Sequence, residues 1–161
     1  MTNERFSYRL KKARNLYGFK QEDVAKELMM NQVNISRYEN GVNEPDIETL
    51  AHLAAFYAVS ADWLLGFGEY PKGEKQSTWN KSNHYTKGFS DRLKLARKQK
   101  GATQESVAFF LKIPQSTLAH YETGRTEPNI RALASLAGFY GVKVDWLLGL
   151  TDYCLQTYRA V

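Results

Sequence analysis

The sequence predicts an all-α protein that consists of two small helical domains in tandem. The chain repeats itself, because residues 6–67 align without a gap with residues 89–150, which lie 83 positions further on, and 32 of the 62 aligned pairs are identical. In both copies, apolar residues recur three or four positions apart, as one face of a helix requires, and the alternation typical of strands is absent. Two copies are too few for a solenoid, and each has the size of a minimal independent domain.

The repeat divides the chain into four segments. They are a first domain at 1–67, a linker at 68–88, a second domain at 89–150 and a tail at 151–161. The linker is rich in lysine, glycine and polar residues without sustained periodicity, so we expect a flexible, solvated segment. In the linker, Trp79 and Tyr85 leave open a local docking on a domain. In the tail, Tyr153, Leu155 and Tyr158 leave open an association of two chains.

The composition of the whole chain excludes several classes of protein. Of its 161 residues, 43% are hydrophobic and 24% are charged, which is typical of a globular protein. No apolar run approaches the roughly 20 residues that cross a bilayer, and the first residues lack the apolar core of a secretory signal. The single cysteine, Cys154, excludes an intramolecular disulfide and a multi-cysteine metal site, so we expect a reducing, cytoplasmic location and no membrane partner.

Net charge gives weak support for a polyanionic partner. The chain carries 22 Lys and Arg against 17 Asp and Glu, a formal net charge of +5. The charge is uneven, because residues 1–70 carry −2, residues 71–88 carry +3 and residues 89–161 carry +4. A case for DNA binding must therefore rest on the repeated pattern rather than on charge.

Each copy shows the pattern of five short helices. The apolar positions that define them in the first copy are, in chain order, Phe6, Leu10 and Ala13; Val24, Ala25 and Leu28; Ile35 and Tyr38; Ile47, Leu50, Leu53, Ala54 and Tyr57; and Trp63, Leu64 and Leu65. The breaks between these helices fall at Gly18, Gly41 and Pro45. Asp46 and its counterpart Asn129 each follow a proline and precede an apolar helical pattern, so both are predicted N-caps, as is Ser60 for the last helix.

The second and third helices of each copy have the pattern of a helix-turn-helix. The small residue Ala25 lets two helices cross closely, and the apolar residues around it fix them at a steep angle. Together with the motifs QEDVAKEL, ISRYENG and DWLLG, this pattern resembles the phage-repressor-like (Cro/CI, or XRE) family of helix-turn-helix DNA-binding domains over about three quarters of the chain. The resemblance implies two lambda-repressor-like five-helix domains. Met29 and Lys112 stand where the family usually has glycine, and a side chain at positive φ there costs roughly 1 kcal/mol.

The resemblance implies that the third helix of each copy enters the major groove of DNA, while the second lies across the backbone. Gln32 offers two hydrogen bonds to adenine, Arg37 a fork to guanine and Val33 an apolar contact to a thymine methyl. The base-contact candidates are Asn31, Gln32, Val33, Arg37, Pro114, Gln115, Ser116 and His120. The phosphate-contact candidates are Gln21 and Gln104, which open the second helices, and Asn40, Thr123 and Arg125, which follow the recognition helices.

Structural roles compete with some of these assignments. In the resembled family the position of Arg14 pairs with a glutamate, so an ion pair is expected rather than a phosphate contact. The expected structural ion pairs are Arg14 with Glu39 and Arg97 with Glu122. Arg37 and His120 remain open between a DNA contact and an ordinary surface position. The histidines share no ligand-type spacing with Cys154, so no metal site is expected.

These features predict a sequence-specific transcriptional regulator that binds double-stranded DNA, and the resemblance favours a repressor that occludes promoter DNA. One chain would act as a covalent pseudo-dimer. Of the four base-contact positions in each copy, only Gln32 and Gln115 are the same residue, so the two half-sites in the DNA are predicted to differ. Two alternatives stay open. In the first, one copy binds DNA while the other mediates self-association into a homodimer. In the second, the chain is a protein-binding module, which the negative net charge of the first copy would suit. No phosphate loop or nucleophile with a placed base is recognisable, so neither enzymatic activity nor a cofactor is expected.

Overall fold

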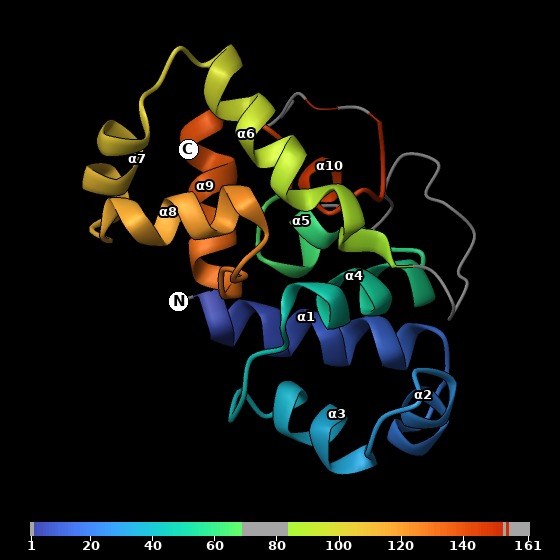
Figure 1. Ribbon diagram of the computed structural model, residues 1–161. Coiled ribbons are helices and arrows are strands. Elements are labelled where there is room, and N and C mark those ends of the chain that lie inside the picture. Colours follow the sequence, from blue (N-terminus) through green and yellow to red (C-terminus); the bar gives the residue numbers. More distant parts are fainter. Residues whose placement is uncertain (1, 69–83, 153, 155–161) are drawn as a thin grey trace.

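The chain folds into two helical bundles with the same order of elements (Figure 1). This computed structural model describes residues 2–68, 84–152 and 154. The first repeat contains α1 (Thr2–Leu16), α2 (Gln21–Glu27), α3 (Gln32–Glu39), α4 (Ile47–Phe56) and α5 (Ala61–Leu64). After a short 3-10 helix, η1 (Tyr85–Gly88), the second contains α6 (Phe89–Gln99), α7 (Gln104–Leu111), α8 (Gln115–Thr123), α9 (Ile130–Tyr140) and α10 (Val144–Leu147). The predicted all-α class with five helices in each repeat is confirmed.

The predicted N-caps hold the starts of three helices. The side chains of Asp46 and Asn129 accept hydrogen bonds, at 2.7 and 2.8 Å, from the backbone N–H groups of Thr49 and Ala132, three residues further on. Ser60 accepts a bond in the same way at the start of α5. Each cap satisfies a backbone donor that the first turn of a helix leaves without a partner, a contribution of about 1 kcal/mol.

The apolar stripes that define the helices form the core. In the first repeat the predicted positions from Phe6 to Leu65 are buried, except for Leu28 and Tyr38, which are half-buried. Buried apolar side chains of both repeats belong to one contiguous cluster. Since burying one such side chain stabilises a fold by about 1.5–3 kcal/mol, this shared cluster supports the packing of the repeats against each other as well as each bundle.

The end of the predicted linker is ordered and joins the two repeats. Residues 85–88 form η1, and the carboxylate of Glu48 in α4 accepts hydrogen bonds from the backbone N–H groups of Tyr85 and Thr86, at 3.1 and 3.0 Å. Tyr85 is buried, so the local docking left open by the sequence does occur at this residue. The other four residues of that group, Trp79, Tyr153, Leu155 and Tyr158, lie outside the described residues.

Candidate nucleic-acid interface

In each repeat, two short helices follow one another across a left-handed turn. Met29, between α2 and α3, has a φ of 53°, and Lys112, between α7 and α8, has a φ of 56°. These are the positions where the resembled family usually has glycine, and the side chains there are accepted at a cost of roughly 1 kcal/mol. Ala25 and Ala108 are both buried, and α2 packs against α3 as α7 packs against α8.

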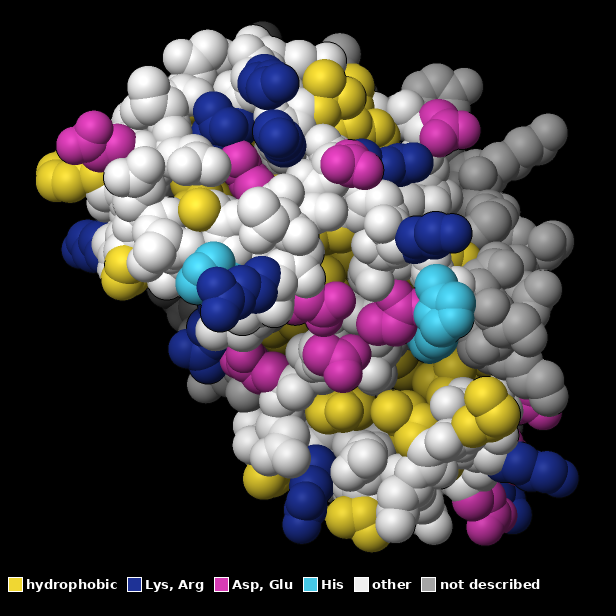
Figure 2. All heavy atoms as spheres, viewed as in Figure 1, with side chains coloured by type: hydrophobic (Ala, Val, Ile, Leu, Met, Phe, Trp, Pro, Cys, Tyr) yellow, Lys and Arg dark blue, Asp and Glu magenta, His cyan; other side chains and the backbone are white. Residues whose placement is uncertain are grey.

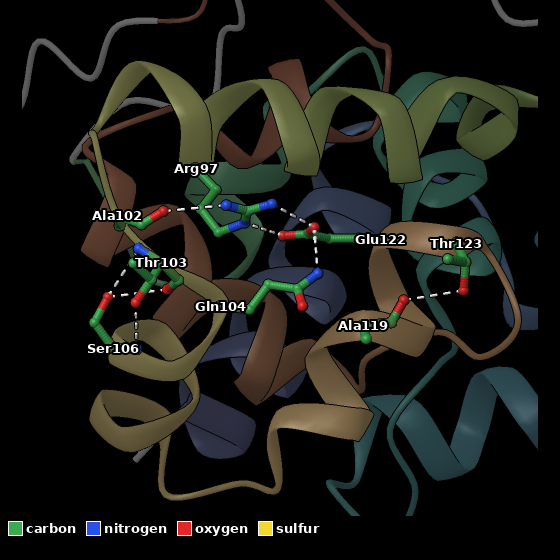
Figure 3. Close-up of polar contacts among 8 residues, drawn as sticks. All are labelled: Arg97, Ala102, Thr103, Gln104, Ser106, Ala119, Glu122 and Thr123. Atoms are coloured by element: carbon green, nitrogen blue, oxygen red, sulfur yellow. Dashed lines mark hydrogen bonds and ion pairs between the residues drawn. The ribbon is translucent and has the colours of Figure 1, made fainter.

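A buried carboxylate ties three helices together in the second repeat (Figure 3). Arg97 of α6 donates to both oxygens of Glu122 in α8, at 2.6 and 2.9 Å, and the amide of Gln104 in α7 donates at 2.9 Å. Burial of Glu122 opposes ionisation, but the hydrogen bonds from Arg97 and Gln104 outweigh it and hold the pKa of this carboxyl below its usual value. The recognition helix α8 is thereby fixed relative to α6 and α7.

The same cluster recurs in the first repeat. Arg14 of α1 donates to both oxygens of Glu39 in α3, at 2.5 and 2.9 Å, and the amide of Gln21 in α2 donates at 2.9 Å. Both expected ion pairs are thus present. Gln21 and Gln104 thus each use an amide N–H group within the protein, and the expectation that these helix starts meet a phosphate stays a prediction. Sequence spacing alone did not reveal these hydrogen bonds, because the partner glutamates lie 18 residues away.

The start of α3 and one position a turn further on form an exposed surface. Gln32, Val33 and Arg37 are exposed, and Arg37 makes no ion pair with any described residue. Asn31 is also exposed, but its side-chain oxygen accepts a hydrogen bond from the backbone N–H of Val33 at 2.9 Å. Asn31 therefore keeps its amide N–H groups for an outside partner, and Arg37 keeps its whole guanidinium.

The equivalent surface of α8 is less charged. Gln115 and Ser116 are exposed, His120 is half-buried, and Pro114 stands before the helix, so this end has no side-chain cap. The two surfaces therefore present different hydrogen-bonding groups to a ligand.

Three predicted phosphate contacts follow the recognition helices, and two of them bond within their own helix. The amide of Asn40 donates to the hydroxyl of Ser36 at 3.3 Å, and the hydroxyl of Thr123 donates to the carbonyl of Ala119 at 2.9 Å (Figure 3). Arg125 is exposed and makes no ion pair with a described residue. Of the three predicted contacts, Arg125 has the chemistry best suited to a phosphate, since it brings a full positive charge.

Acidic side chains gather where the two repeats meet. Figure 2 shows them near the middle of one face, between the repeats. Burial and the charges of Asp46 and Glu48 raise the pKa of Glu127, which places these three carboxylates close together. These carboxylates disfavour a phosphate at this boundary, whereas Arg37 and Arg125 are exposed cations beside the recognition helices.

The two repeats meet through reciprocal helix caps. Asp62 of α5 accepts hydrogen bonds from the backbone N–H groups of Val144 and Asp145 in α10, at 3.0 and 3.1 Å. Asp145 in turn accepts from the backbone N–H of Ala61 at 2.7 Å and from the hydroxyl of Ser60. Sequence reasoning assigned no role to this pair. The available signal was a charged residue kept at the same position of an otherwise apolar segment in both copies.

The arrangement of α1, α2 and α3, and of α6, α7 and α8, can be compared with known proteins. The helix-turn-helix family matches the chain twice, over residues 10–64 and 93–147. The chain belongs to the phage-repressor-like (XRE) helix-turn-helix family. The two matched ranges lie 83 positions apart, as the internal repeat requires, so each repeat holds one complete helix-turn-helix unit.

Relatives of this helix-turn-helix protein are named as transcriptional regulators. The HTH-type transcriptional regulator ImmR of Bacillus subtilis (strain 168) is 34% identical over 105 residues, which are 65% of this chain and 83% of ImmR. The SPbeta prophage-derived regulator YonR of the same strain is 40% identical over 60 residues, 37% of this chain and 56% of YonR. The transcriptional activator BcrR of Enterococcus faecalis is 29% identical over 94 residues, 56% of this chain and 46% of BcrR. The chain thus spans about half the length of YonR and BcrR, and no solved structure matches it significantly.

Neither a metal-binding cluster nor a membrane-spanning helix occurs in the part of the chain that the structure describes. It contains no group of three or more His, Cys, Asp or Glu side chains that could hold a metal ion. None of its helices is both long and apolar enough to span a membrane.

Proposed function

We propose that this DNA-binding transcriptional regulator reads one operator with both recognition helices at once, as an intramolecular pseudo-dimer. The observation that carries the proposal is the reciprocal contact of Asp62 and Asp145, which joins two exposed helix-turn-helix surfaces in one chain. Reciprocal contacts between equivalent positions are the mark of an approximate two-fold relation. Helix-turn-helix dimers with this symmetry read two half-sites in inverted orientation.

Each recognition helix reads its own half-site. In α3, Gln32 and Arg37 supply the hydrogen bonds suited to adenine and guanine, while in α8 the polar groups are those of Gln115, Ser116 and His120. Because these sets differ, the two half-sites are unlike. We further propose that the chain represses transcription in the cytoplasm by covering promoter DNA, since a bound protein excludes others from the same sequence. Because the relative BcrR is named as an activator, a reporter assay is the direct check on whether this chain represses or activates transcription.

A second candidate function has one observation in its favour. Phe109 and Phe110 of α7 are 87% and 55% exposed, at the positions where the first repeat carries Lys26 and Glu27. Large exposed aromatic side chains are typical of protein-binding surfaces, so the second repeat is a candidate for binding another protein while the first reads DNA. If this alternative holds, Gln115→Ala leaves DNA affinity unchanged and Phe109→Ser abolishes binding of the partner.

The salt dependence of binding tests the proposed function. Arg125→Gln is expected to weaken binding to operator and unrelated DNA alike, and to reduce the slope of log affinity against log salt by about one, because one ionic phosphate contact is lost. The measurement is an electrophoretic mobility shift titration of the intact chain at several salt concentrations. Arg131→Gln is the matched control, because Arg131 already pairs with Glu44 at 2.8 Å. A chain that shows no salt dependence, or binds no DNA at low salt, contradicts the proposal.

A further inference from the structure

We propose that Asp62 and Asp145 are positioning residues that fix the distance between the two recognition helices, and so determine which spacing between half-sites the chain accepts. This inference rests on the proposed function, because it concerns how the two reading surfaces are held relative to one another. Neither aspartate lies on α3 or α8, so both would act on DNA through the placement of these helices.

Each aspartate caps the short helix that carries the other aspartate. α5 and α10 are four-residue helices, and the N–H groups of their first turns have no partner inside their own helix. Each aspartate supplies the missing acceptor for the other repeat, and both are buried, with 1% and 5% of Asp62 and Asp145 exposed. Rotating the packed repeats would leave two buried carboxyl groups and three backbone donors without partners, a cost that favours one orientation.

Two contacts at the edge of this joint support the same orientation. At the start of η1, the carboxylate of Glu48 in α4 accepts hydrogen bonds from the backbone N–H groups of Tyr85 and Thr86 and from the hydroxyl of Thr86. At Gly149, behind α10, a Cβ would lie 2.7 Å from the carbonyl oxygen of Tyr85, so η1 packs closely against the end of the second repeat. Figure 1 shows α5 and α10 at the centre of the molecule, with α3 toward the bottom and α8 toward the left.

A fixed orientation has a direct consequence for recognition. Adding one base pair between half-sites moves one of them along the duplex and rotates it about the axis, since a turn holds about 10–10.5 base pairs. A rigid pair of recognition helices cannot follow this change. Two domains joined by a coil alone would follow it, because the span of a coil adapts at little cost. A sharp spacing preference is therefore the signature of the joint.

The protonation of the joint provides a test that needs no substitution. Burial, together with the negative charge of Asp145, raises the pKa of Asp62 from its usual value near 4 to about 8. The other charged groups at these helices are the buried Lys143, which precedes α10, and Arg9 and Arg92, which donate to carbonyls of α5 and α10. Between about pH 4 and 8 the docked repeats hold a proton that separated repeats release, so docking weakens as the pH rises through about 8.

The experiment measures the affinity of the intact chain for its operator, selected from random DNA, and for versions with one, two or three base pairs added or removed between the half-sites. The wild-type chain is expected to lose at least about tenfold in affinity at the first change of spacing, as one recognition helix loses its contacts. Asp62→Ala combined with Asp145→Ala is expected to reduce this loss to less than about threefold, while the preference for bases within each half-site is kept. Glu44→Gln, which removes the exposed pair with Arg131 at the same boundary, is the control and keeps the wild-type profile.

The wild-type chain is also compared at about pH 6 and about pH 9, where the spacing preference is expected to be sharper at the lower pH. The ratio of affinities between spacings is used, because general effects of pH on DNA binding cancel in it. If the double variant does not fold, as judged by circular dichroism, this comparison alone decides. Equal affinity of the wild type across spacings, or a preference unaffected by both the substitutions and pH, overturns the inference. A chain that binds no operator, or a single half-site, overturns instead the proposed function.

Discussion

Glu39→Ala is expected to lower the free energy of unfolding by about 3 kcal/mol, because it removes one partner of a buried ion pair. Glu39 receives two hydrogen bonds from Arg14 and one from Gln21, and its side chain is 1% exposed. Without this carboxylate, the guanidinium of Arg14, whose side chain is 13% exposed, loses its ion-pair partner, and α3 loses its tie to α1 and α2. The lower end of the usual range applies, since Arg14 retains a hydrogen bond to the carbonyl of Phe19.

Urea denaturation of the intact chain measures this loss, and Glu122→Ala provides the matched variant. Glu122 has the same three hydrogen bonds and a side chain that is 3% exposed, so a loss of similar size is expected from the second repeat. Glu39→Gln keeps the shape and one acceptor and is expected to lose less. A change below about 0.5 kcal/mol for Glu39→Ala would show that this carboxylate is not part of the framework that holds α3.

Arg37→Ala is expected to weaken operator binding by about 5- to 150-fold, which corresponds to the roughly 1–3 kcal/mol of one bidentate contact to a base. Arg37 is exposed one turn beyond the start of α3 and makes no ion pair with a described residue, so its substitution leaves the fold intact. The preference for guanine is expected to relax at one position of one half-site, as measured by titration against operators with single base changes.

Arg37→Lys separates base reading from simple attraction to phosphate. Lysine keeps the charge but lacks the planar fork, so affinity for unrelated DNA should persist while the base preference weakens. His120→Ala changes the equivalent position of α8 and is expected to act on the other half-site alone. Unchanged binding of the Arg37→Ala protein to the operator would mean that a different face of α3 meets the DNA.

The helices themselves could be predicted closely from the sequence, because local signals determine them. Two of these signals act within a few residues: the proline before Asp46 or Asn129, and the spacing of apolar residues. The third is the internal repeat, which shows the same signals a second time. The hydrogen bonds of Gln21 and Gln104 to a glutamate were not predicted, because that glutamate lies in another helix. A polar residue at the start of a helix has the same pattern whether it faces a phosphate or a buried carboxylate in another helix.

The joint between the repeats could not be predicted, and the reason is physical. Asp62 and Asp145 stand in an identical segment of both copies, and nothing within one repeat shows that its aspartate completes the helix cap of the other. The polar composition of residues 68–88 predicted a flexible segment, yet η1 at its end docks on α4 through Glu48. Contacts between domains depend on the complementarity of two surfaces, which periodicity within either one does not contain.

The central claim is that both recognition helices of one chain bind one operator. Its most direct test is a selection of bound sequences from a random DNA pool by the intact chain, followed by measurement of the number of chains per DNA. We predict two unlike half-sites in inverted orientation, separated by one spacing and occupied by a single chain. A selected sequence that contains one half-site, or a perfect palindrome occupied by two chains, would contradict the claim that both repeats of one chain read the operator together.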